Sequence, residues 1–497
     1  MFSDEYITSK KILFVSSEVF PFVKSGGLAD VSCALPKALK KLGHDVRVVL
    51  PRYWSIDKYQ YNLKPVIAPM GVQMGNCLVW CAVFESKIDD IPVYFIEHEQ
   101  FFGRSGIYDD GKKAYYDNAE RYGFLCKAAL QLCRDINFKP DIAHSNDWQT
   151  ALLAPYLKTW HAYDSFFRNT ASVFSIHNIA YQGIFHPNSL RFLGIGNEHF
   201  TESKFENFGY INFMKGALFF ADAISTVSPS YAREILAEPG GNGLGPYLKR
   251  RHEDLHGILN GVDYDCWNPE TDTIIPAKYS LDDMSGKAEC KKALQREFWL
   301  RESPNVPIFG IVARFTPQKG LQLLAPIIEK LVTEMLAQFV FLGSGEKNLE
   351  DFFGGLPAKH PGTIGAWIGY NNYKAHLIES GADFFLMPSL YEPCGLNQIY
   401  SMKYGTLPIV RKTGGLNDTV WSYNEQTGEG TGFCFDAIDP YALYYTIGWA
   451  VSTYYDRPEH MRNMKKLAMS ANFSWQTSAE QYSRLYEKAI NRRNSWW

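Results

Sequence analysis

Short apolar segments of strand length alternate with amphipathic segments over most of the first half of the chain. Residues 11–16 have the β-branched and aromatic content of a strand, and leucine or valine then recurs at helical spacing from Leu28 to Leu42, until Gly43 ends the pattern. Further strands are predicted at residues 45–50, 93–96, 171–176 and 223–227. Strands and helices that alternate in this way are typical of an α/β domain, with a parallel sheet covered by helices.

The alternation starts again in the second half, with strands predicted at residues 307–313, 338–342, 383–387 and 407–410. The two series are separated by residues 259–273, LNGVDYDCWNPETDT, whose Asn, Asp, Pro and Gly content is typical of a loop. The chain has 497 residues, well beyond the roughly 250 to 300 at which one hydrophobic core stops growing. We therefore predict two α/β domains of similar size, followed by an amphipathic helix from Ala479.

Composition excludes several classes of protein. Lys and Arg number 50 against 53 Asp and Glu, so the chain lacks the basic excess of a nucleic-acid-binding protein. Nine cysteines without a CxxC pair favour reduced thiols over disulfides and give no spaced cluster for a metal. No signal peptide and no membrane-spanning run is recognised. We expect a cytoplasmic protein without membrane or nucleic-acid partners, whose oligomeric state the sequence leaves open.

One short pattern occurs in both halves, as KSGGLADV at residues 24–31 and KTGGLNDTV at residues 412–420. Consecutive glycines at a strand-to-helix turn allow a ligand to approach the backbone, and the N–H groups of a helix start attract anions. Either copy alone is better explained by a tight turn without a ligand. Because ligands of open α/β sheets lie beyond the carboxyl ends of the strands, the two copies together favour a diphosphate site in a cleft between facing domains.

Arg314 and Lys319 lie five residues apart in ARFTPQKG, directly after a predicted strand. A loop framed by Pro317 and Gly320 can direct both cations at one anion, although a solvated loop would contain the same residues. Transfer of a sugar from a nucleotide diphosphate leaves a group of growing negative charge, which fixed cations stabilise without a metal ion. The sequence therefore indicates a sugar-nucleotide site that needs no metal.

Six ordered blocks make the chain resemble the glycogen and starch synthase family, retaining glucosyltransferases with two Rossmann-like domains of the GT-B type. The blocks are SSEVFPFVKSGGLADV from residue 16, HSNDWQTAL from 144, SIHNIAYQGIF from 175, GILNGVDYDCWNP from 257, VARFTPQKG from 312 and PSLYEPCGLNQIYSMKYGTLPIVRKTGGLNDTV from 388. The resemblance covers nearly the whole chain. It implies transfer of glucose from ADP-glucose to the non-reducing end of an α-1,4-glucan, glycogen or starch, with retention of configuration and without a cofactor. It also implies an acceptor domain over residues 1–260, a donor domain over 261–478, a deep cleft between them, and a helix over 479–497 that returns to the first domain.

The resemblance also assigns residues. It implies that His177, Glu392, Arg314 and Lys319 form the catalytic set, with Glu392 at the transferred glucose and the two cations at the diphosphate. Further donor contacts are implied for Lys24, Gly26, Gly27, Tyr370, Gly395, Thr413, Gly414, Gly415 and Leu416, with Tyr370 on the nucleobase, adenine or uracil. Acceptor contacts are implied for Asp30, Tyr108, Asn146, Asp147, Trp148 and Asn178.

Ordinary structural roles remain open for several of these residues. His177 can be a buried structural histidine, Glu392 can cap the helix that follows, and most aromatic residues of the first half can be core residues. Retaining glycosidases use two close carboxylates, and no second carboxylate motif accompanies Glu392. We therefore favour attack on the face of the sugar that the diphosphate leaves, with the diphosphate helping to deprotonate the acceptor.

Three other functions fit parts of the pattern. A sugar-nucleotide epimerase also binds a diphosphate, but HSNDWQTAL and the first Gly-Gly block would have no purpose in it. A glucan phosphorylase would need pyridoxal phosphate, which absorbs near the visible edge. A glucan-binding protein without activity would not need Lys24, Arg314, Lys319 and Glu392.

Overall fold

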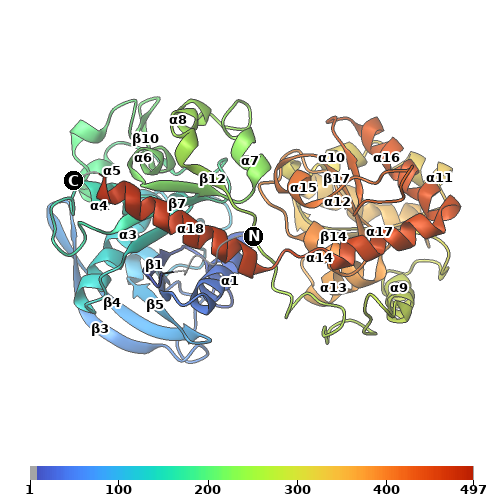
Figure 1. The fold of residues 1–497 in the computed structure, drawn as a ribbon, viewed down its shortest axis with the longest axis horizontal. Helices are drawn as coiled ribbons and strands as arrows, with labels where there is room; N and C mark the ends of the chain where they lie inside the picture. Colours follow the sequence, from blue (N-terminus) through green and yellow to red (C-terminus); the bar gives the residue numbers. More distant parts are fainter. Residues whose placement is uncertain (1–7, 496–497) are drawn as a thin grey trace. The chain divides into compact units, whose positions relative to one another are not determined.

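The computed structural model describes residues 8–495, which form two compact α/β units (Figure 1). The first unit contains the described residues up to Val227, Ala232–Gly261 and the chain from Trp475 onward. The second unit contains Val262–Ser474 together with Ser228–Tyr231. The predicted domain boundary lies between residues 260 and 261 and does not include the small excursion at Ser228–Tyr231.

A mixed sheet forms the centre of the first unit. Its order is β12-β11-β7-β6-β1-β2-β5-β4-β3, and neighbouring strands from β12 to β5 run parallel. The strands are β1 (Lys11–Val15), β2 (Asp45–Pro51), β3 (Lys64–Met74), β4 (Cys77–Ile88), β5 (Ile91–Glu97), β6 (Ile142–Asn146), β7 (Ala171–Ile176), β11 (Ala223–Thr226) and β12 (Leu255–Gly257). Each strand predicted for this half is present.

The prediction of a parallel sheet is wrong at one edge, where β3 and β4 pair antiparallel with each other and β4 pairs antiparallel with β5. The two strands form a hairpin whose turn contains Gly75, at φ +48°. Because the hairpin lies at the edge of the sheet, many of its side chains are exposed, and it lacks the continuous apolar run by which the central strands are recognised. A small antiparallel sheet of β8 (Ile184–Phe185), β10 (Tyr210–Asn212) and β9 (Glu206–Asn207) was also not predicted.

Helices cover the sheet of the first unit. They are α1 (Gly27–Lys41), α2 (Glu99–Phe102), α3 (Asn118–Asp135), α4 (Leu153–Lys158), α5 (Ser189–Leu193), α6 (Phe213–Phe220), α7 (Pro229–Glu234, which begins in the second unit), α8 (Gly245–Arg250) and α18 (Trp475–Asn494). The helix predicted from Ala479 is α18, which begins four residues earlier and packs on α1 and β7 (Figure 1). Its buried Tyr486 hydroxyl lies 2.8 Å from Nδ1 of His144 on β6, so the end of the chain is joined to the central sheet.

A parallel sheet of order β15-β14-β13-β16-β17-β18 forms the centre of the second unit. The strands are β13 (Ile308–Phe315), β14 (Gln338–Gly345), β15 (Ile364–Ile368), β16 (Phe384–Met387), β17 (Leu407–Arg411) and β18 (Phe433–Phe435). The helices are α9 (Ser285–Glu297), α10 (Leu321–Leu324), α11 (Ile328–Glu334), α12 (Lys347–Lys359), α13 (Asn372–Gly381), α14 (Asn397–Lys403), α15 (Gly414–Thr419), α16 (Pro440–Asp456) and α17 (Pro458–Ser470). All four strands predicted in this half are present.

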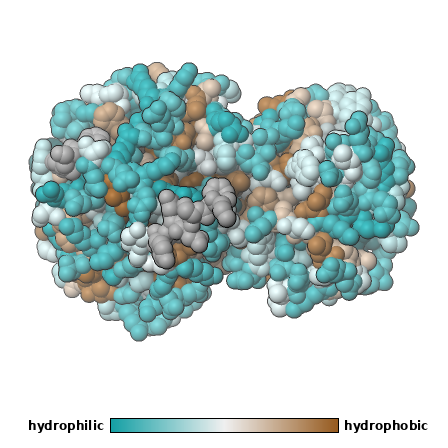
Figure 2. All heavy atoms as spheres, in the orientation of Figure 1, coloured by the Kyte–Doolittle hydropathy of each residue, from teal (hydrophilic) through white to brown (hydrophobic). Residues whose placement is uncertain are grey.

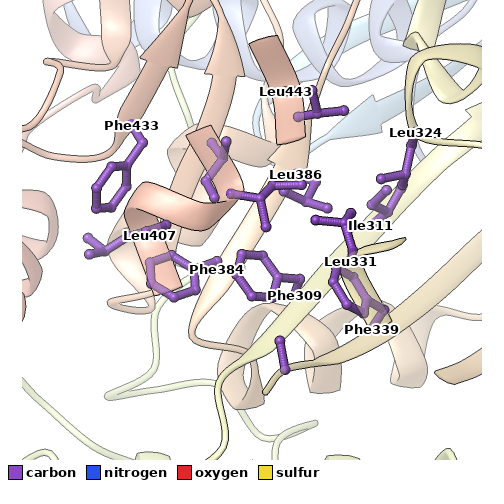
Figure 3. Packing of buried hydrophobic residues seen from close by; sticks show 14 of the residues in the cluster. Phe309, Ile311, Leu324, Leu331, Phe339, Phe384, Leu386, Leu407, Phe433 and Leu443 are labelled. Carbon is purple, nitrogen blue, oxygen red and sulfur yellow. The ribbon is translucent and has the colours of Figure 1, made fainter. Parts of the chain in front are cut away.

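One large hydrophobic cluster of the second unit lies on one face of this sheet (Figure 3), and a second cluster, which contains Val340, Leu342 and Phe385, lies on the other face. Phe309, Phe339 and Phe384 come from three neighbouring strands, are fully buried, and stack with ring centroids 4.8 and 5.2 Å apart. Leu324, Leu331 and other apolar side chains of the covering helices complete the cluster. Burial stabilises each such side chain by about 1.5–3 kcal/mol, so the apolar runs that predict the strands also hold the helices against them.

Both sheets have the same topology in their parallel parts. Numbered along the chain, the parallel strands of each unit follow the order 3-2-1-4-5-6 of doubly wound sheets, with a seventh strand added in the first unit. The order reverses between β1 and β6 in the first unit and between β13 and β16 in the second. Ligands of such sheets bind beyond the carboxyl ends of the strands at this reversal.

The face shown in Figure 2 is largely hydrophilic, with apolar residues in separate small patches. Over residues 8–495, no helix is both long and apolar enough to cross a membrane.

Candidate functional site

At the reversal point of the second unit, a lysine and a glutamate form a short ion pair. Lys319 follows β13 and Glu392 follows β16, and Nζ of Lys319 lies 2.6 Å from Oε2 of Glu392. The Ser389 hydroxyl donates to the same oxygen at 3.1 Å. Glu392 is only 5% exposed, so its carboxylate depends on these two partners. The structure thus brings together two of the four predicted catalytic residues.

A close approach of two loops holds Lys319 in place. Gly320 has φ +70°, and a Cβ there would lie 1.8 Å from the carbonyl oxygen of Pro388. The Leu390 amide also donates to the Gln318 carbonyl at 2.8 Å. Only glycine fits at position 320, because both the backbone conformation and the contact exclude a side chain.

Arg314, the other predicted diphosphate cation, lies near the end of β13 and is exposed. It forms no salt bridge with any residue in the described part of the chain. At this edge of the sheet, Lys319 is paired with a carboxylate, whereas Arg314 has no carboxylate partner among the described residues.

The second Gly-Gly turn packs against the backbone that carries Glu392. The Gly415 amide donates to the carbonyls of Glu392 and Pro393, at 3.1 and 3.2 Å. A Cβ on Gly414 would lie 2.0 Å from the Glu392 carbonyl oxygen, and one on Gly415 would lie 2.0 Å from that of Cys394. These glycines are therefore needed to bring α15 against the Glu392 loop, and the Gly415 amide already has acceptors within the chain.

The remaining predicted donor residues of this unit differ in exposure. Tyr370 follows β15 at the same edge and is 78% exposed, as a platform for a nucleobase would be. Gly395 has φ +72°, which explains its glycine. Thr413 is buried at the start of α15, and the Leu416 side chain is fully buried in a core cluster, so only the backbone of Leu416 could contact a donor.

The first Gly-Gly turn lies at the start of α1 and differs from the second. A Cβ on Gly26 or on Gly27 would meet no atom within 4 Å, and neither residue has a positive φ. Neither packing nor backbone conformation requires glycine there, so the space beside this turn is open to a ligand. Lys24 stands next to it, with Nζ 2.8 Å from Oδ1 of Asp30, and both side chains are partly exposed. Burial raises the pKa of Asp30, although Lys24 opposes the shift.

Glu18 is a site residue that the sequence analysis did not single out. Its carboxylate is 3% exposed and accepts from the Ser25 amide, the Ser25 hydroxyl at 2.6 Å and the Gly26 amide at 3.2 Å. Tyr108 donates its hydroxyl to the same carboxylate at 2.5 Å. The N–H group of Gly26, in the turn predicted to bind a phosphate, thus binds a carboxylate of the chain itself, as does that of Ser25. The sequence feature that could have revealed Glu18 is its position as a single acidic residue in the apolar segment after the first strand.

Asp147 follows β6 in a strained conformation, with φ +54° and ψ −176°. Its Oδ1 accepts from the amides of His177 and Asn178, at 2.7 and 3.3 Å. Burial raises the pKa of Asp147 to about 7, against the effect of these two amides. Asp147 thereby joins the end of β6 to the segment after β7.

His177 is held as a neutral imidazole in one tautomer. Burial lowers its pKa to about 4. Its Nε2 lies 3.0 Å from Oδ1 of Asn146, whose amide group donates to the Val15 carbonyl at 3.0 Å. The side-chain nitrogen of Asn146 donates to Val15, so the side-chain oxygen of Asn146 is the atom that faces His177 and accepts its hydrogen bond. Nε2 of His177 therefore carries the proton, and Nδ1 is left as an acceptor.

The other predicted acceptor residues occupy more ordinary positions. The Asn178 side chain accepts from the Ala180 amide at 3.0 Å. Trp148 is only 9% exposed and packs against Tyr108, Tyr122 and Phe185, with ring centroids 5.0 to 6.3 Å away. Little of the Trp148 ring is left to contact a glucan. Tyr108 is partly exposed and, through Glu18, belongs to the first Gly-Gly turn.

Within residues 8–495, no three His, Cys, Asp or Glu side chains gather in a way that could hold a metal ion.

Comparison with known proteins shows the family to which the chain belongs. The model of the starch synthase catalytic domain matches residues 11–250, and that of the group 1 glycosyl transferases matches residues 295–468. Glycogen synthase 1 of Geobacter metallireducens is 47% identical, and the alignment covers 97% of each chain. The chain belongs to the glycogen and starch synthase family. Glycogen synthase of Treponema denticola is 44% identical, over 98% of this chain and 99% of that one.

Solved structures place this glycogen and starch synthase chain in the two-domain GT-B fold class. The catalytic domain of starch synthase IV from Arabidopsis thaliana, bound to ADP and acarbose, superposes with a TM-score of 0.89 at 33% identity, covering 97% of this chain and 100% of that one. Sucrose-phosphate synthase from Thermosynechococcus elongatus has a TM-score of 0.59 at 16% identity and shares the fold. The chain is thus a glucosyltransferase of glycogen or starch synthesis. The cleft between facing domains and the roles of individual residues stay predictions.

Proposed function

We propose that this enzyme transfers glucose from ADP-glucose to the non-reducing end of an α-1,4-glucan, with retention of configuration. The observation that carries the proposal is the ion pair of Lys319 and Glu392 beside the exposed Arg314, at the reversal point of the second unit. A solved relative with a TM-score of 0.89 is bound to ADP and acarbose, which supports ADP as the nucleotide and a glucan as the acceptor.

In the proposed reaction, Arg314 and Lys319 bind the diphosphate of the donor. As the bond between the anomeric carbon and the diphosphate oxygen breaks, negative charge grows on the leaving ADP, and fixed cations lower the barrier by stabilising it. Lys319 is suited to this task because the Gly320 and Pro388 contact holds its loop before the donor arrives. Glu392 orients Lys319 and faces the transferred glucose.

The glucan hydroxyl attacks the anomeric carbon from the face that ADP leaves. A new carbon–oxygen bond replaces the one broken, and the proton of the hydroxyl passes to the departing diphosphate. Because attack and departure occur on the same face of the sugar, the configuration is retained. The Glu392 carboxylate contacts a lysine and a serine, which fits an orienting role better than that of a nucleophile paired with a second carboxylate. Trapping of a glycosyl ester on Glu392 would overturn this step.

We assign the first Gly-Gly turn and the segment after β7 to the reacting sugars. Lys24 and Asp30 flank open space at Gly26 and Gly27, and His177 presents an unprotonated Nδ1 at neutral pH. A neutral imidazole can accept a hydrogen bond from a sugar hydroxyl without adding charge to the site.

The test is a donor comparison with pure enzyme and glycogen. ADP-glucose and UDP-glucose are supplied separately, and nucleoside diphosphate release is measured together with glucan lengthening. We expect glucan-dependent release of ADP and much slower release of UDP. Release of nucleotide without a glucan, or a preference for UDP-glucose, would contradict the proposal.

A further inference from the structure

A second cation-rich pocket lies at the opposite end of the sheet of the second unit. Its volume is about 580 Å³, and its walls come from α9, α17 and the end of α16. Lys287 donates to the carbonyls of Ser380 and Tyr404, which precede β16 and β17. Arg314 and Glu392 lie at or beyond the carboxyl ends of β13 and β16, so this pocket is separate from the donor site.

Positive charge in the lining exceeds negative charge. The cations are Lys287, Lys291, Arg462, Lys465 and Lys466, whereas the only carboxylate in the lining is Asp383. Asp383 lies 2.8 Å from Nζ of Lys291 and 3.6 Å from Nζ of Lys465, so one carboxylate serves two lysines. Arg462 pairs with Glu459 at the surface, at 3.0 Å. Lys287 and Lys466 form no ion pair with a carboxylate of the lining.

Lys287 is the most unusual of these cations because it is 6% exposed and its three hydrogen-bond acceptors are neutral oxygens, at 2.7 to 3.0 Å. Burial lowers its pKa to about 7, and the positive charge of Lys465 acts in the same direction. Glu379 interacts electrostatically with Lys287, and burial raises the pKa of this acid well above its usual range. Lys287 and Lys291 are also one turn apart on α9, where like charges repel.

We propose that this pocket binds a small phosphorylated anion, which Lys465 and Lys466 contact at the mouth in the field of Lys287 and Lys291. Lysine ammonium groups bind phosphate as compact point charges. A phosphomonoester carries about 1.5 to 2 negative charges near pH 7, opposite in sign to the net charge of the lining. Met284, Met461 and Tyr454 give the pocket an apolar side for the organic part. A nucleic acid would need a long basic surface, and the chain as a whole carries a net charge of −3.

The test is isothermal titration calorimetry with two probes, inorganic phosphate and glucose 6-phosphate. It uses the full chain carrying Lys319→Ala, which removes one cation of the proposed donor site, and comparison of pocket variants with a control outside the pocket keeps its outcome independent of the proposed function. We expect saturable binding of one phosphate group per chain, weakened at least tenfold by Lys465→Ala with Lys466→Ala, and weakened by added salt. Tighter binding of glucose 6-phosphate would identify a phosphomonoester as the ligand, and equal binding would identify free phosphate.

Two further variants keep the test decisive. Lys359→Ala removes an exposed cation at the end of α12, outside the pocket, and should leave binding within twofold. Lys466→Glu changes an exposed side chain, so the protein should fold normally, yet it should weaken binding at least as much as the double variant. Absence of saturable binding for both probes overturns the proposal, as does equal affinity of the pocket variants and the Lys359→Ala control.

Discussion

Replacement of Lys319 by alanine separates a structural role from a chemical one. The substitution removes the ammonium group 2.6 Å from Glu392 and leaves that carboxylate, 5% exposed, with the Ser389 hydroxyl. A buried acceptor that loses its partner costs about 1–3 kcal/mol. For a unit of this size, each kcal/mol corresponds to roughly 2–4 °C, so the unfolding midpoint should fall by about 2–12 °C.

The effect on turnover should be larger. If Lys319 stabilises the charge that develops on the leaving diphosphate, its loss should lower kcat by about 10²–10³-fold, or ~2.7–4 kcal/mol, as for other charge-stabilising donors. Differential scanning calorimetry gives the midpoint, and coupled measurement of ADP release gives kcat. Lys347→Ala is the matched control, because Lys347 pairs with Asp351 at 2.8 Å but is exposed on α12, and neither quantity should change much.

A second substitution tells the two roles apart. Glu392→Gln in the Lys319→Ala background replaces the unpaired carboxylate by a neutral amide, so most of the lost stability should return while turnover should stay low. The reasoning is refuted if Lys319→Ala retains kcat within threefold of the wild type, or if the double variant recovers activity together with stability.

Three further predictions concern single residues. Asp147, whose folded-state pKa of about 7 exceeds its ordinary value of 3.8, binds a proton more tightly when folded; its contribution to stability is therefore complete below pH 3.8 and is lost as the pH rises to about 7. Denaturant unfolding at several pH values should show this loss in the wild type and not in Asp147→Asn; identical profiles would contradict it. Gly415→Ala should lower the unfolding midpoint because the new Cβ would lie 2.0 Å from the Cys394 carbonyl oxygen, whereas Gly27→Ala should leave the midpoint unchanged and lower kcat/KM for ADP-glucose. The opposite pattern would show that the roles assigned to the two turns are wrong. His177, with a pKa of about 4, should add no acidic limb to the kcat profile above pH 5, and a limb near pH 6.5 that disappears in His177→Gln would show that it titrates normally.

The sequence predicts the fold well where burial is continuous. Strands such as β7 and β16 are buried on both faces, because helices cover both sides of a parallel sheet, and their ends are close to the predicted ones. The hairpin of β3 and β4 has one edge in solvent, so its pattern lacks that signal. α18 was recognised from its apolar periodicity, but its hydrogen bond to His144 joins residues 342 apart in sequence and could not be read from local pattern.

The site was predictable as a set of residue types, but not as a set of contacts. KSGGLADV and KTGGLNDTV look equivalent in sequence, yet the glycines of the first face open space and those of the second pack on the Glu392 loop. Glu18 was missed because its importance comes from amides and a tyrosine that folding brings to it. Trp148 shows the opposite case, since an aromatic residue in a family motif is mostly buried against other rings.

The central claim is that glucose passes from ADP-glucose to the non-reducing end of a glucan with its configuration retained. A short maltooligosaccharide is incubated with the enzyme and ADP-glucose, and the product is examined by proton NMR and mass spectrometry while ADP is quantified. We predict one added hexose for each ADP released, and an anomeric signal of a new α-1,4 linkage. A β-linked product, or ADP release with formation of free glucose in place of a longer glucan, would contradict the account.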